Sequence, residues 1–230
     1  MIKNVLVELA FDGRDFKGYQ YQKDQRTVEK ELKKAVNEVT GEDNRIIACG
    51  RTDAGVHAKK FYVNFLTASK INPKGFSYHI QPHLPDDIFA ISSREVGLDF
   101  HARFSCKTKT YRYIIRLDKN PHPIYRSYTE NISYRLDYDK LSKGLDMLKG
   151  KHDFRLFMKE DKNLEINTIR SIDECYYEKR GNILSIYFKA NSFLHNQVRI
   201  MVGSLIDLSR GRTSLDDFKA YICLLYTSPS

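Results

Sequence analysis

The sequence lacks most of the patterns that indicate a metal or cofactor enzyme. Its four cysteines lie far apart and form no Cys-x-x-Cys pair, which argues against a zinc ribbon or a disulfide scaffold and fits a reducing compartment. There is no Gly-x-Gly-x-x-Gly, Walker loop or Ser-His-Asp arrangement, so a nucleotide cofactor or acyl transfer has no support. His79 and His83 are four residues apart, but Pro82 between them opposes a helical metal site. We expect neither a metal nor a cofactor.

Long apolar runs and an excess of acidic residues are missing as well. No segment approaches the length of a membrane span. The N-terminal residues 1–4 precede a strand-like run and not the long apolar stretch of a signal peptide, so we expect a cytoplasmic protein. Lys and Arg number 38 against 29 Asp and Glu, which gives a net charge of +9 and mildly favours a polyanionic partner. Between Arg94 and Arg126, basic residues alternate with aromatic ones, a combination that suits the phosphates and unpaired bases of RNA.

Hydrophobic spacing predicts an α+β protein made of two subdomains. The first has the strand and helix order of a ferredoxin-like unit. Its predicted elements are a strand at 2–11, a helix from Thr27 to a stop at Gly41, two strands flanking residues 50–58, a helix at 72–81 and a strand at 88–96. Adjacent Asp86 and Asp87 predict a turn before the last of these strands.

The second subdomain is predicted to have a similar layout. Its expected elements are a strand at 107–117, helices at 138–149 and 194–208, a hairpin of 169–178 with 183–190, and a last short helix begun by a Ser214–Asp217 capping box. We expect two ferredoxin-like α/β subdomains, 1–97 and 98–222, that share a central antiparallel sheet. Residues 223–230 form an atypical tail, which we expect to be either foreign to the gene or the mark of a truncation.

The most informative stretch is Gly-Arg-Thr-Asp-Ala-Gly-Val-His-Ala at residues 50–58. It lies between apolar runs at 46–49 and 61–65, and its glycines predict a tight loop that presents Asp53 at the edge of a sheet. Such a carboxylate can serve as a nucleophile, a base or a salt-bridge partner. The alternative is an Asx-type turn in which Asp53 caps its own backbone.

This nonapeptide resembles the catalytic signature of the tRNA pseudouridine synthase A family. Five further segments resemble family motifs in the family's order: 11–20, 84–88, 100–105, 109–113 and 192–203. Tyr19 stands where a Trp is usual in the family. Family members also continue past the last helix into a closing strand, and this chain has no counterpart of that segment.

The resemblance implies an isomerase that converts uridine to pseudouridine in the tRNA anticodon stem-loop, at positions 38–40, as a homodimer without a cofactor. It implies that Asp53 is the catalytic carboxylate, that Arg199 forms its salt bridge and that Tyr111 stacks on the flipped base. The RNA-binding residues that it implies are Arg51, Arg103, Lys109 and His57. The apolar neighbours of Arg199, namely Val198 and Ile200 to Val202, further predict a partly buried setting for this side chain.

Two other classes of function remain open. A non-catalytic tRNA-binding or RNA-binding protein, or an inactive fragment of the same fold, is favoured by the absence of the closing segment. An RNA hydrolase would need a His pair or a carboxylate cluster for a metal, and neither is evident.

Overall fold

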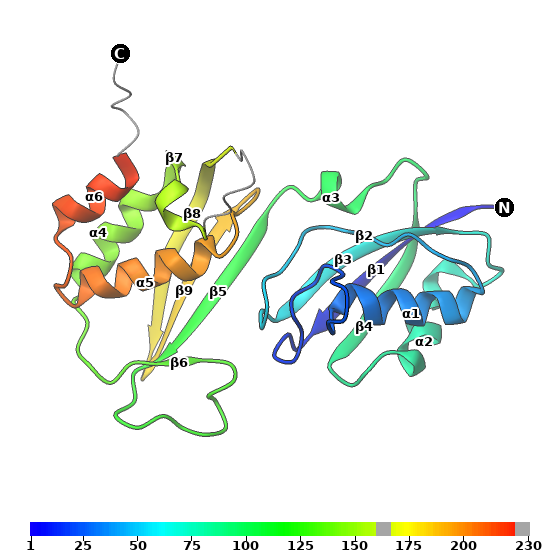
Figure 1. The fold of residues 1–230 in the computed structure, drawn as a ribbon, viewed down its shortest axis with the longest axis horizontal. Coiled ribbons are helices and arrows are strands. Elements are labelled where there is room, and N and C mark those ends of the chain that lie inside the picture. The colour runs from blue at the N-terminus through cyan, green and yellow to red at the C-terminus, as the bar shows by residue number, and fades with distance from the viewer. Residues whose placement is uncertain (160–166, 224–230) are drawn as a thin grey trace, which may run out of the picture. The chain divides into compact units, whose positions relative to one another are not determined.

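The chain folds as two compact units, residues 1–107 and 108–230, each with its own sheet and core (Figure 1). The structure is a computed structural model that describes residues 1–159 and 167–223; all of the predicted tail except Cys223 lies outside this range. The predicted α+β class with two subdomains is confirmed. Strand pairing defines one sheet within each unit, where the sequence led us to expect a single shared sheet.

Unit 1 has the predicted ferredoxin-like order. Its elements are β1 (Lys3–Phe11), α1 (Val28–Thr40), β2 (Ile47–Ala48), β3 (Ala58–Thr67), α2 (Phe76–Ile80) and β4 (Ile88–Val96). The strands lie in the order β2-β3-β1-β4, and every neighbouring pair is antiparallel. The predicted helix at 72–81 is shorter than expected, since Pro73 and Pro82 lie in 3-10 turns on either side of α2.

Helix α1 begins and ends where its sequence predicts. The Thr27 side chain accepts a hydrogen bond from the Lys30 backbone N–H, and Gly41 ends the helix with a left-handed φ of 72°. The buried side of α1 packs against side chains from one face of the sheet. The core of unit 1 includes Val28, Leu32 and Val36 from α1, Val5, Val7 and Leu9 from β1, and Phe76 and Ile80 from α2.

The other face of this sheet carries the segment after β4. Asn4 Nδ2 donates to the carbonyls of Gly97 and Phe100, at 2.9 and 3.0 Å. Asn64 Nδ2 donates to Asn4 Oδ1, and its Oδ1 accepts from the Ala102 N–H at 2.8 Å. These bonds explain why the compact unit extends to Lys107, ten residues beyond the boundary that the sequence suggested.

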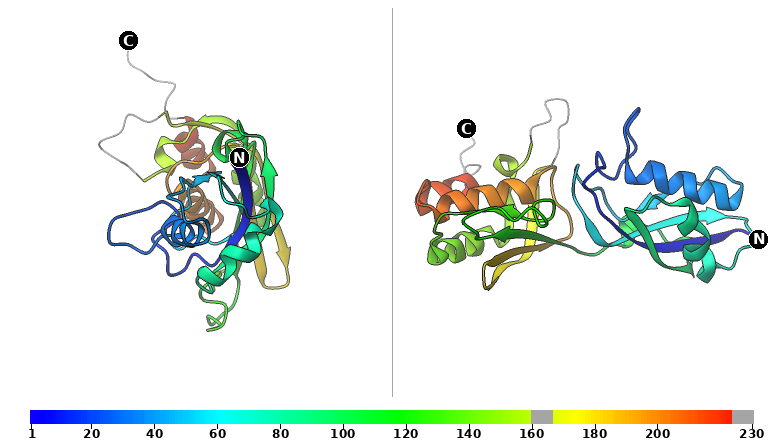
Figure 2. Two further views of the ribbon diagram at one scale, coloured as in Figure 1. Left: turned by 90° about the vertical axis from the view of Figure 1, so that its right-hand side faces the viewer. Right: turned by 90° about the horizontal axis from the view of Figure 1, so that it is seen from below.

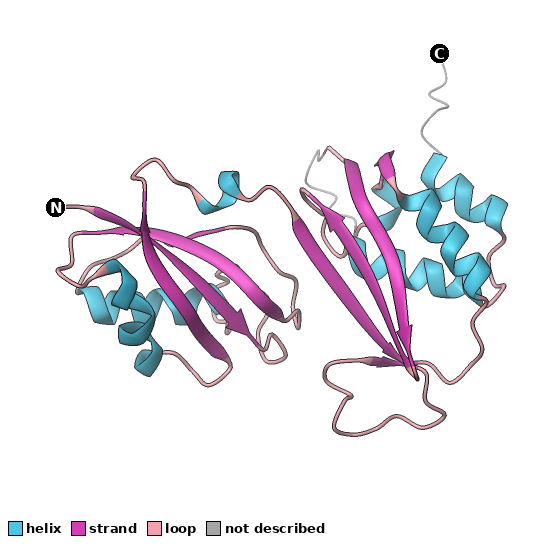
Figure 3. Ribbon diagram, turned by 180° about the vertical axis from the view of Figure 1, so that it is seen from behind, coloured by secondary structure: helices cyan, strands magenta, loops and turns pink. Residues whose placement is uncertain are grey.

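Unit 2 is built around the long hairpin of β8 and β9, yellow to orange in Figure 2. Its elements are β5 (Lys109–Arg116), β6 (Glu130–Asn131), α4 (Tyr138–Leu148), β7 (Gly150–Asp153), β8 (Ile169–Arg180), β9 (Ile183–Ala190), α5 (Gln197–Ser209) and α6 (Leu215–Cys223). The sheet order is β6-β5-β9-β8-β7, and only the short β5–β6 pair is parallel. Figure 3 shows the helices of this unit gathered on one side of its strands.

Three details of unit 2 compare informatively with the prediction. The Ser214–Asp217 capping box is confirmed, with Asp217 N–H donating to Ser214 Oγ at 3.1 Å. Helix α5 begins at Gln197 and not at Leu194, because Asn196 has a left-handed φ of 58° and interrupts the helical path. The strands β6 and β7 were not predicted; both are short, and β7 is polar.

Among the described residues, no helix is long and apolar enough to cross a bilayer.

The cap of α4 gives a direct test of this fold. Asp137 accepts hydrogen bonds from the N–H groups of Asp139 and Lys140, each at 3.0 Å. Asp137→Ala should lower the free energy of unfolding by about 1 kcal/mol in urea denaturation followed by circular dichroism. Asp137→Asn retains a capping oxygen and should stay close to the parent. An Asp137→Ala variant as stable as the parent would show that this cap contributes nothing.

Candidate active site

The loop that carries Asp53 runs from the end of β2 to the start of β3. Its tip is a tight turn in which the Val56 N–H donates to the Asp53 carbonyl at 3.2 Å. Gly55 occupies the turn with a φ of 76°, a conformation that favours glycine. The turn leaves Asp53 half-buried and Arg51 exposed on the approach to it.

A second loop, residues 12–20 between β1 and α1, is fastened to this turn by backbone hydrogen bonds. The Gly55 N–H donates to the Phe16 carbonyl at 3.2 Å, and the Tyr19 N–H donates to the Thr52 carbonyl at 3.1 Å. Phe16 and Tyr19 are themselves buried in the core of unit 1. Two family-like motifs that are separate in the sequence, 11–20 and 50–58, therefore form one interlocked pair of loops, which we call the double loop.

Two glycines make the close approach of these loops possible. A Cβ atom at Gly13 would overlap the carbonyl of Val56. A Cβ atom at Gly18 would lie 2.5 Å from the Thr52 carbonyl oxygen, and Gly18 also has a φ of 94°. Both glycines are thus required by contacts with the backbone on either side of Asp53.

His57 lies at the base of the double loop beside Asp12. Its Nδ1 atom is 2.9 Å from Asp12 Oδ1 and 3.2 Å from the Gly13 backbone nitrogen. These contacts compete, because Nδ1 must carry a proton to donate to Asp12 and must lack one to accept from Gly13. Asp12 also accepts hydrogen bonds from the backbone N–H and the guanidinium of Arg14. His57 consequently shapes the loop through its contacts with Asp12 and Gly13.

Arg103 lies on the short helix α3 (Ala102–Ser105), which the Asn4–Asn64 pair holds against the sheet of unit 1. Its side chain is exposed. Next to it Phe104 is 79% exposed, and its ring stacks on His101 at a centroid distance of 4.3 Å. An exposed cation beside an exposed phenyl ring is a combination that single-stranded nucleic acid can use.

Two of the predicted site residues in unit 2 lie on β5. Tyr111 is half-buried and meets the edge of Phe193 at a centroid distance of 5.1 Å. Lys109 is two residues away, so it lies on the same face of the strand, and its Nζ donates to the Asn191 carbonyl at 3.1 Å. The helix-covered face of β5 therefore presents an aromatic ring and a cation together.

The predicted burial of Arg199 is wrong, because the side chain is exposed on α5. Its apolar neighbours in sequence point in other directions around the helix, and Met201 and Val202 enter the core instead. Burial raises the pKa of nearby Tyr113, and the positive charge of Arg199 acts in the opposite direction. Arg199 is thus a cation on the surface of unit 2, close enough to Tyr113 to influence its titration.

The structure groups the predicted site residues within each unit. In unit 1 the loop after β2 carries Arg51, Asp53 and His57. In unit 2 strand β5 carries Lys109 and Tyr111, while Arg199 belongs to α5. No three His, Cys, Asp or Glu side chains of residues 1–159 and 167–223 are grouped as metal ligands.

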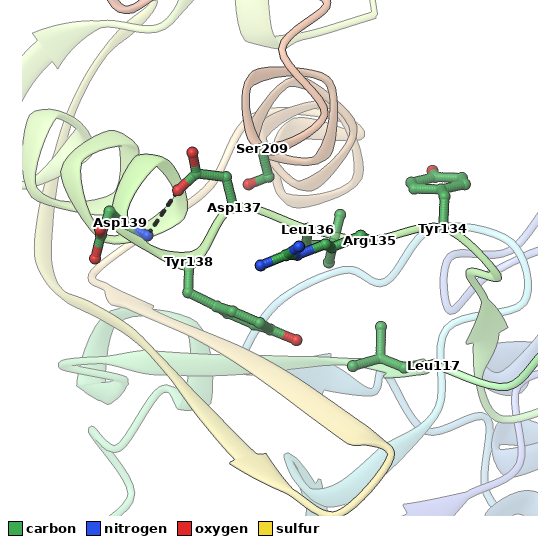
Figure 4. A pocket seen from close by; sticks show the side chains of 8 residues that line it. All are labelled: Leu117, Tyr134, Arg135, Leu136, Asp137, Tyr138, Asp139 and Ser209. Atoms are coloured by element: carbon green, nitrogen blue, oxygen red, sulfur yellow. Dashed lines mark hydrogen bonds between the residues drawn. The ribbon is translucent and has the colours of Figure 1, made fainter.

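An open hollow in unit 2 contains none of the predicted site residues (Figure 4). It is lined by Leu117, Tyr134, Arg135, Leu136, Asp137, Tyr138, Asp139 and Ser209. Its wall is formed where α4 begins, and the Asp137 N–H donates to the Ser209 carbonyl at the end of α5. The carboxylate of Asp137 caps α4, as the dashed line to Asp139 in Figure 4 marks. The hollow therefore follows from the junction of two helices.

Comparison with known proteins agrees with this geometry. The family model for tRNA pseudouridine synthase matches residues 9–105 and 145–223, more than half of the chain and the whole of the double loop. The chain belongs to the tRNA pseudouridine synthase family. It is 42% identical over 218 residues to tRNA pseudouridine synthase A of Finegoldia magna, a match that covers 95% of this chain and 89% of that protein. It is 39% identical over 216 residues to the proteins of the same name from Clostridium botulinum strain Eklund 17B and Thermoanaerobacter sp. strain X514, with 94% of this chain and 88% of each relative covered.

The contact between the two loops of this synthase can be tested with a pair of glycine variants. Gly18 and Gly41 both have a positive φ, but a Cβ atom at Gly41 would meet nothing within 4 Å. Gly41→Ala should cost about 1–2 kcal/mol of unfolding free energy from backbone strain alone. Gly18→Ala should cost about 1–3 kcal/mol more, because it also pushes on the Thr52 carbonyl. Urea denaturation measures both, and similar losses would contradict the close approach described here.

Proposed function

We propose that this chain is an isomerase that converts uridine to pseudouridine in tRNA, with Asp53 as its catalytic carboxylate. The observation that carries the proposal is the double loop, in which backbone bonds from residues 16 and 19 fix the turn that presents Asp53. Family membership supplies the reaction class. A rigid turn suits this chemistry, because a catalytic group must be held in position before its substrate arrives.

The reaction requires one catalytic carboxylate. The bond from the ribose to N1 of uracil breaks, the base turns over, and a carbon–carbon bond to C5 forms; the proton at C5 is released and N1 takes up a proton, so the formula is unchanged. A carboxylate can assist by attacking the sugar or the base, or by abstracting a ribose proton. The conversion is redox-neutral, so it requires no redox cofactor.

The other site residues keep the roles that the family resemblance implies. In this proposal Arg199 pairs with Asp53 in the active enzyme and orients its carboxylate, since a guanidinium can donate directed hydrogen bonds to a carboxylate. Tyr111 stacks on the extruded uracil, which returns about 1–3 kcal/mol of the unstacking cost. Arg51, Arg103, Lys109 and His57 contact the RNA. The exposure of Arg51 and Arg103 supports this role for both of them.

The finer assignments belong to the same proposal. The substrate is the anticodon stem-loop of tRNA, the target uridines are those at positions 38–40, and the active form is a cytoplasmic homodimer. The net charge of +9 supports a polyanionic substrate.

Removing the Asp53 carboxylate should abolish turnover without abolishing binding. Asp53→Asn changes one atom of a half-buried side chain, so the tRNA dissociation constant should stay within a few fold of the parent. The measurement is tritium release from tRNA labelled at C5 of uridine. Asp86→Asn is the matched control, because Asp86 is an exposed carboxylate in the turn before β4 and should release tritium at the parental rate.

The possible outcomes separate the competing functions. Activity in Asp53→Asn would refute the assignment of Asp53. Absence of tritium release by the parent chain, with tRNA binding intact, would favour the non-catalytic RNA-binding alternative.

Phosphate contacts should dominate tRNA affinity, because the chain is basic and tRNA is a polyanion. The logarithm of the association constant should then fall linearly as the logarithm of the salt concentration rises, with a slope set by the number of phosphates neutralised. Filter binding between about 50 and 200 mM salt would measure this slope. An affinity that does not change with salt would count against a tRNA substrate.

A further inference from the structure

Arg26, just before α1, forms a two-pronged ion pair with Asp87, just before β4. Its Nη1 donates to Asp87 Oδ2 at 2.7 Å, and its Nη2 donates to Asp87 Oδ1 at 2.8 Å. The side chains are 37% and 24% exposed, so the pair is partly shielded from water. A bidentate guanidinium–carboxylate pair fixes the orientation of both groups as well as attracting them.

The same guanidinium also covers the ring of Phe16 in the double loop. The Arg26 Cζ atom lies 4.0 Å from the ring centroid, which is the geometry of a cation–π contact. Phe16 is only 2% exposed, and its carbonyl accepts the hydrogen bond from Gly55 in the Asp53 turn. Arg26 is therefore connected to the Asp53 turn through one intervening residue.

Backbone bonds from the two partners hold part of the loop of residues 12–20. The Asp12 N–H donates to the Asp87 carbonyl at 2.9 Å, and the Lys17 N–H donates to the Arg26 carbonyl at 2.9 Å. Arg26 and Asp87 thus fasten the segment from Asp12 to Lys17 at its beginning and its end. They touch it in three ways, through one ring contact and two backbone bonds, and the ion pair joins the two partners to each other.

We propose that Arg26 is a positioning residue that, together with Asp87, holds the double loop in the geometry that presents Asp53. This inference rests on the proposed role of Asp53. Arg26 acts through Phe16 and Asp87 and has no contact with the reacting atoms.

A direct contact from Arg26 to an RNA phosphate is the competing interpretation. The geometry disfavours it, because both terminal nitrogens already donate to Asp87, whose negative charge offsets that of Arg26. One face of the guanidinium is also occupied by Phe16. The two interpretations predict different changes in rate and affinity, which makes them separable.

The first measurement needs no substrate and tests the hold that Arg26 and Asp87 have on the double loop, which we call the clamp. Amide hydrogen exchange in Arg26→Gln should accelerate by about tenfold or more at Gly55 and Asp12, whose N–H groups donate to Phe16 and Asp87, as expected for local opening. The amide of Val7, in the middle of β1, should exchange at the parental rate. Lys33→Gln is the control, since it breaks an exposed ion pair with Asp43 that involves no residue of the double loop, and it should change none of these amides.

The second measurement tests positioning under single-turnover conditions with saturating enzyme. Arg26→Gln should lower the rate by about 10- to 100-fold, because small displacements of a catalytic group are costly. The tRNA dissociation constant should remain within about twofold and the salt slope unchanged, whereas loss of a phosphate contact would reduce that slope by about one. Arg26→Lys should fall between Gln and the parent, because an ammonium cannot reproduce the planar fork.

A double variant tests whether Arg26 acts through Asp87. Arg26→Gln/Asp87→Asn should be no slower than the slower of the two single variants, since both remove the same pair. Additive losses would overturn that coupling.

The remaining outcomes are decisive in different ways. Unchanged exchange at Gly55 and Asp12 in Arg26→Gln would refute the clamp, and faster exchange with a parental rate would refute its role in positioning. Weaker binding with a reduced salt slope and a normal rate would establish the phosphate contact instead. If Asp53→Asn remains active, the proposed role of Asp53 fails, yet the exchange data, collected without tRNA, still decide whether the clamp exists.

Discussion

The site in unit 1 depends on two loops whose backbones touch. Hydrogen bonds at Phe16 and Tyr19 reach the residues on either side of Asp53, and the absence of a Cβ atom at Gly13 and Gly18 leaves the required space. A loop at the edge of a sheet is ordinarily among the more mobile parts of a protein. Here the aromatic side chains of Phe16 and Tyr19 are anchored in the core, so the rigidity of the core is transmitted to the turn.

Charged side chains reinforce this arrangement from the outside of the loops. At the start of the loop of residues 12–20, Asp12 forms an ion pair with Arg14 and contacts His57. The ion pair between Arg26 and Asp87 connects the start of α1 to the start of β4. Partly exposed ion pairs contribute little to overall stability. Under the proposal made above, the contribution of the Arg26–Asp87 pair is geometric, because it adds to the backbone bonds at Asp12 and Lys17.

The sequence predicted best what depends on neighbouring residues. The caps of α1 at Thr27 and Gly41 and the capping box at Ser214 were found because their signals span a few positions. The start of α5 was missed because it depends on a left-handed Asn196 and on Gln197 accepting from the Leu194 N–H, which no periodicity reveals. The Arg26–Asp87 pair joins residues 61 apart, and the turn predicted at Asp86 and Asp87 gave no sign of a distant partner. The motif at 50–58 identified Asp53, but only the structure revealed that its loop is held by residues 12–20.

The buried Asn4–Asn64 pair has a consequence for how the chain can be divided. Their side-chain amides satisfy the carbonyls of Gly97 and Phe100 and the N–H of Ala102. A separately expressed first unit that stops at residue 97 would lose the Phe100 carbonyl and the Ala102 N–H as partners of these amides, at a cost typical of unsatisfied polar groups. Dissection of the protein should therefore cut after Lys107, and the segment bearing Arg103 would then travel with the half that contains Asp53.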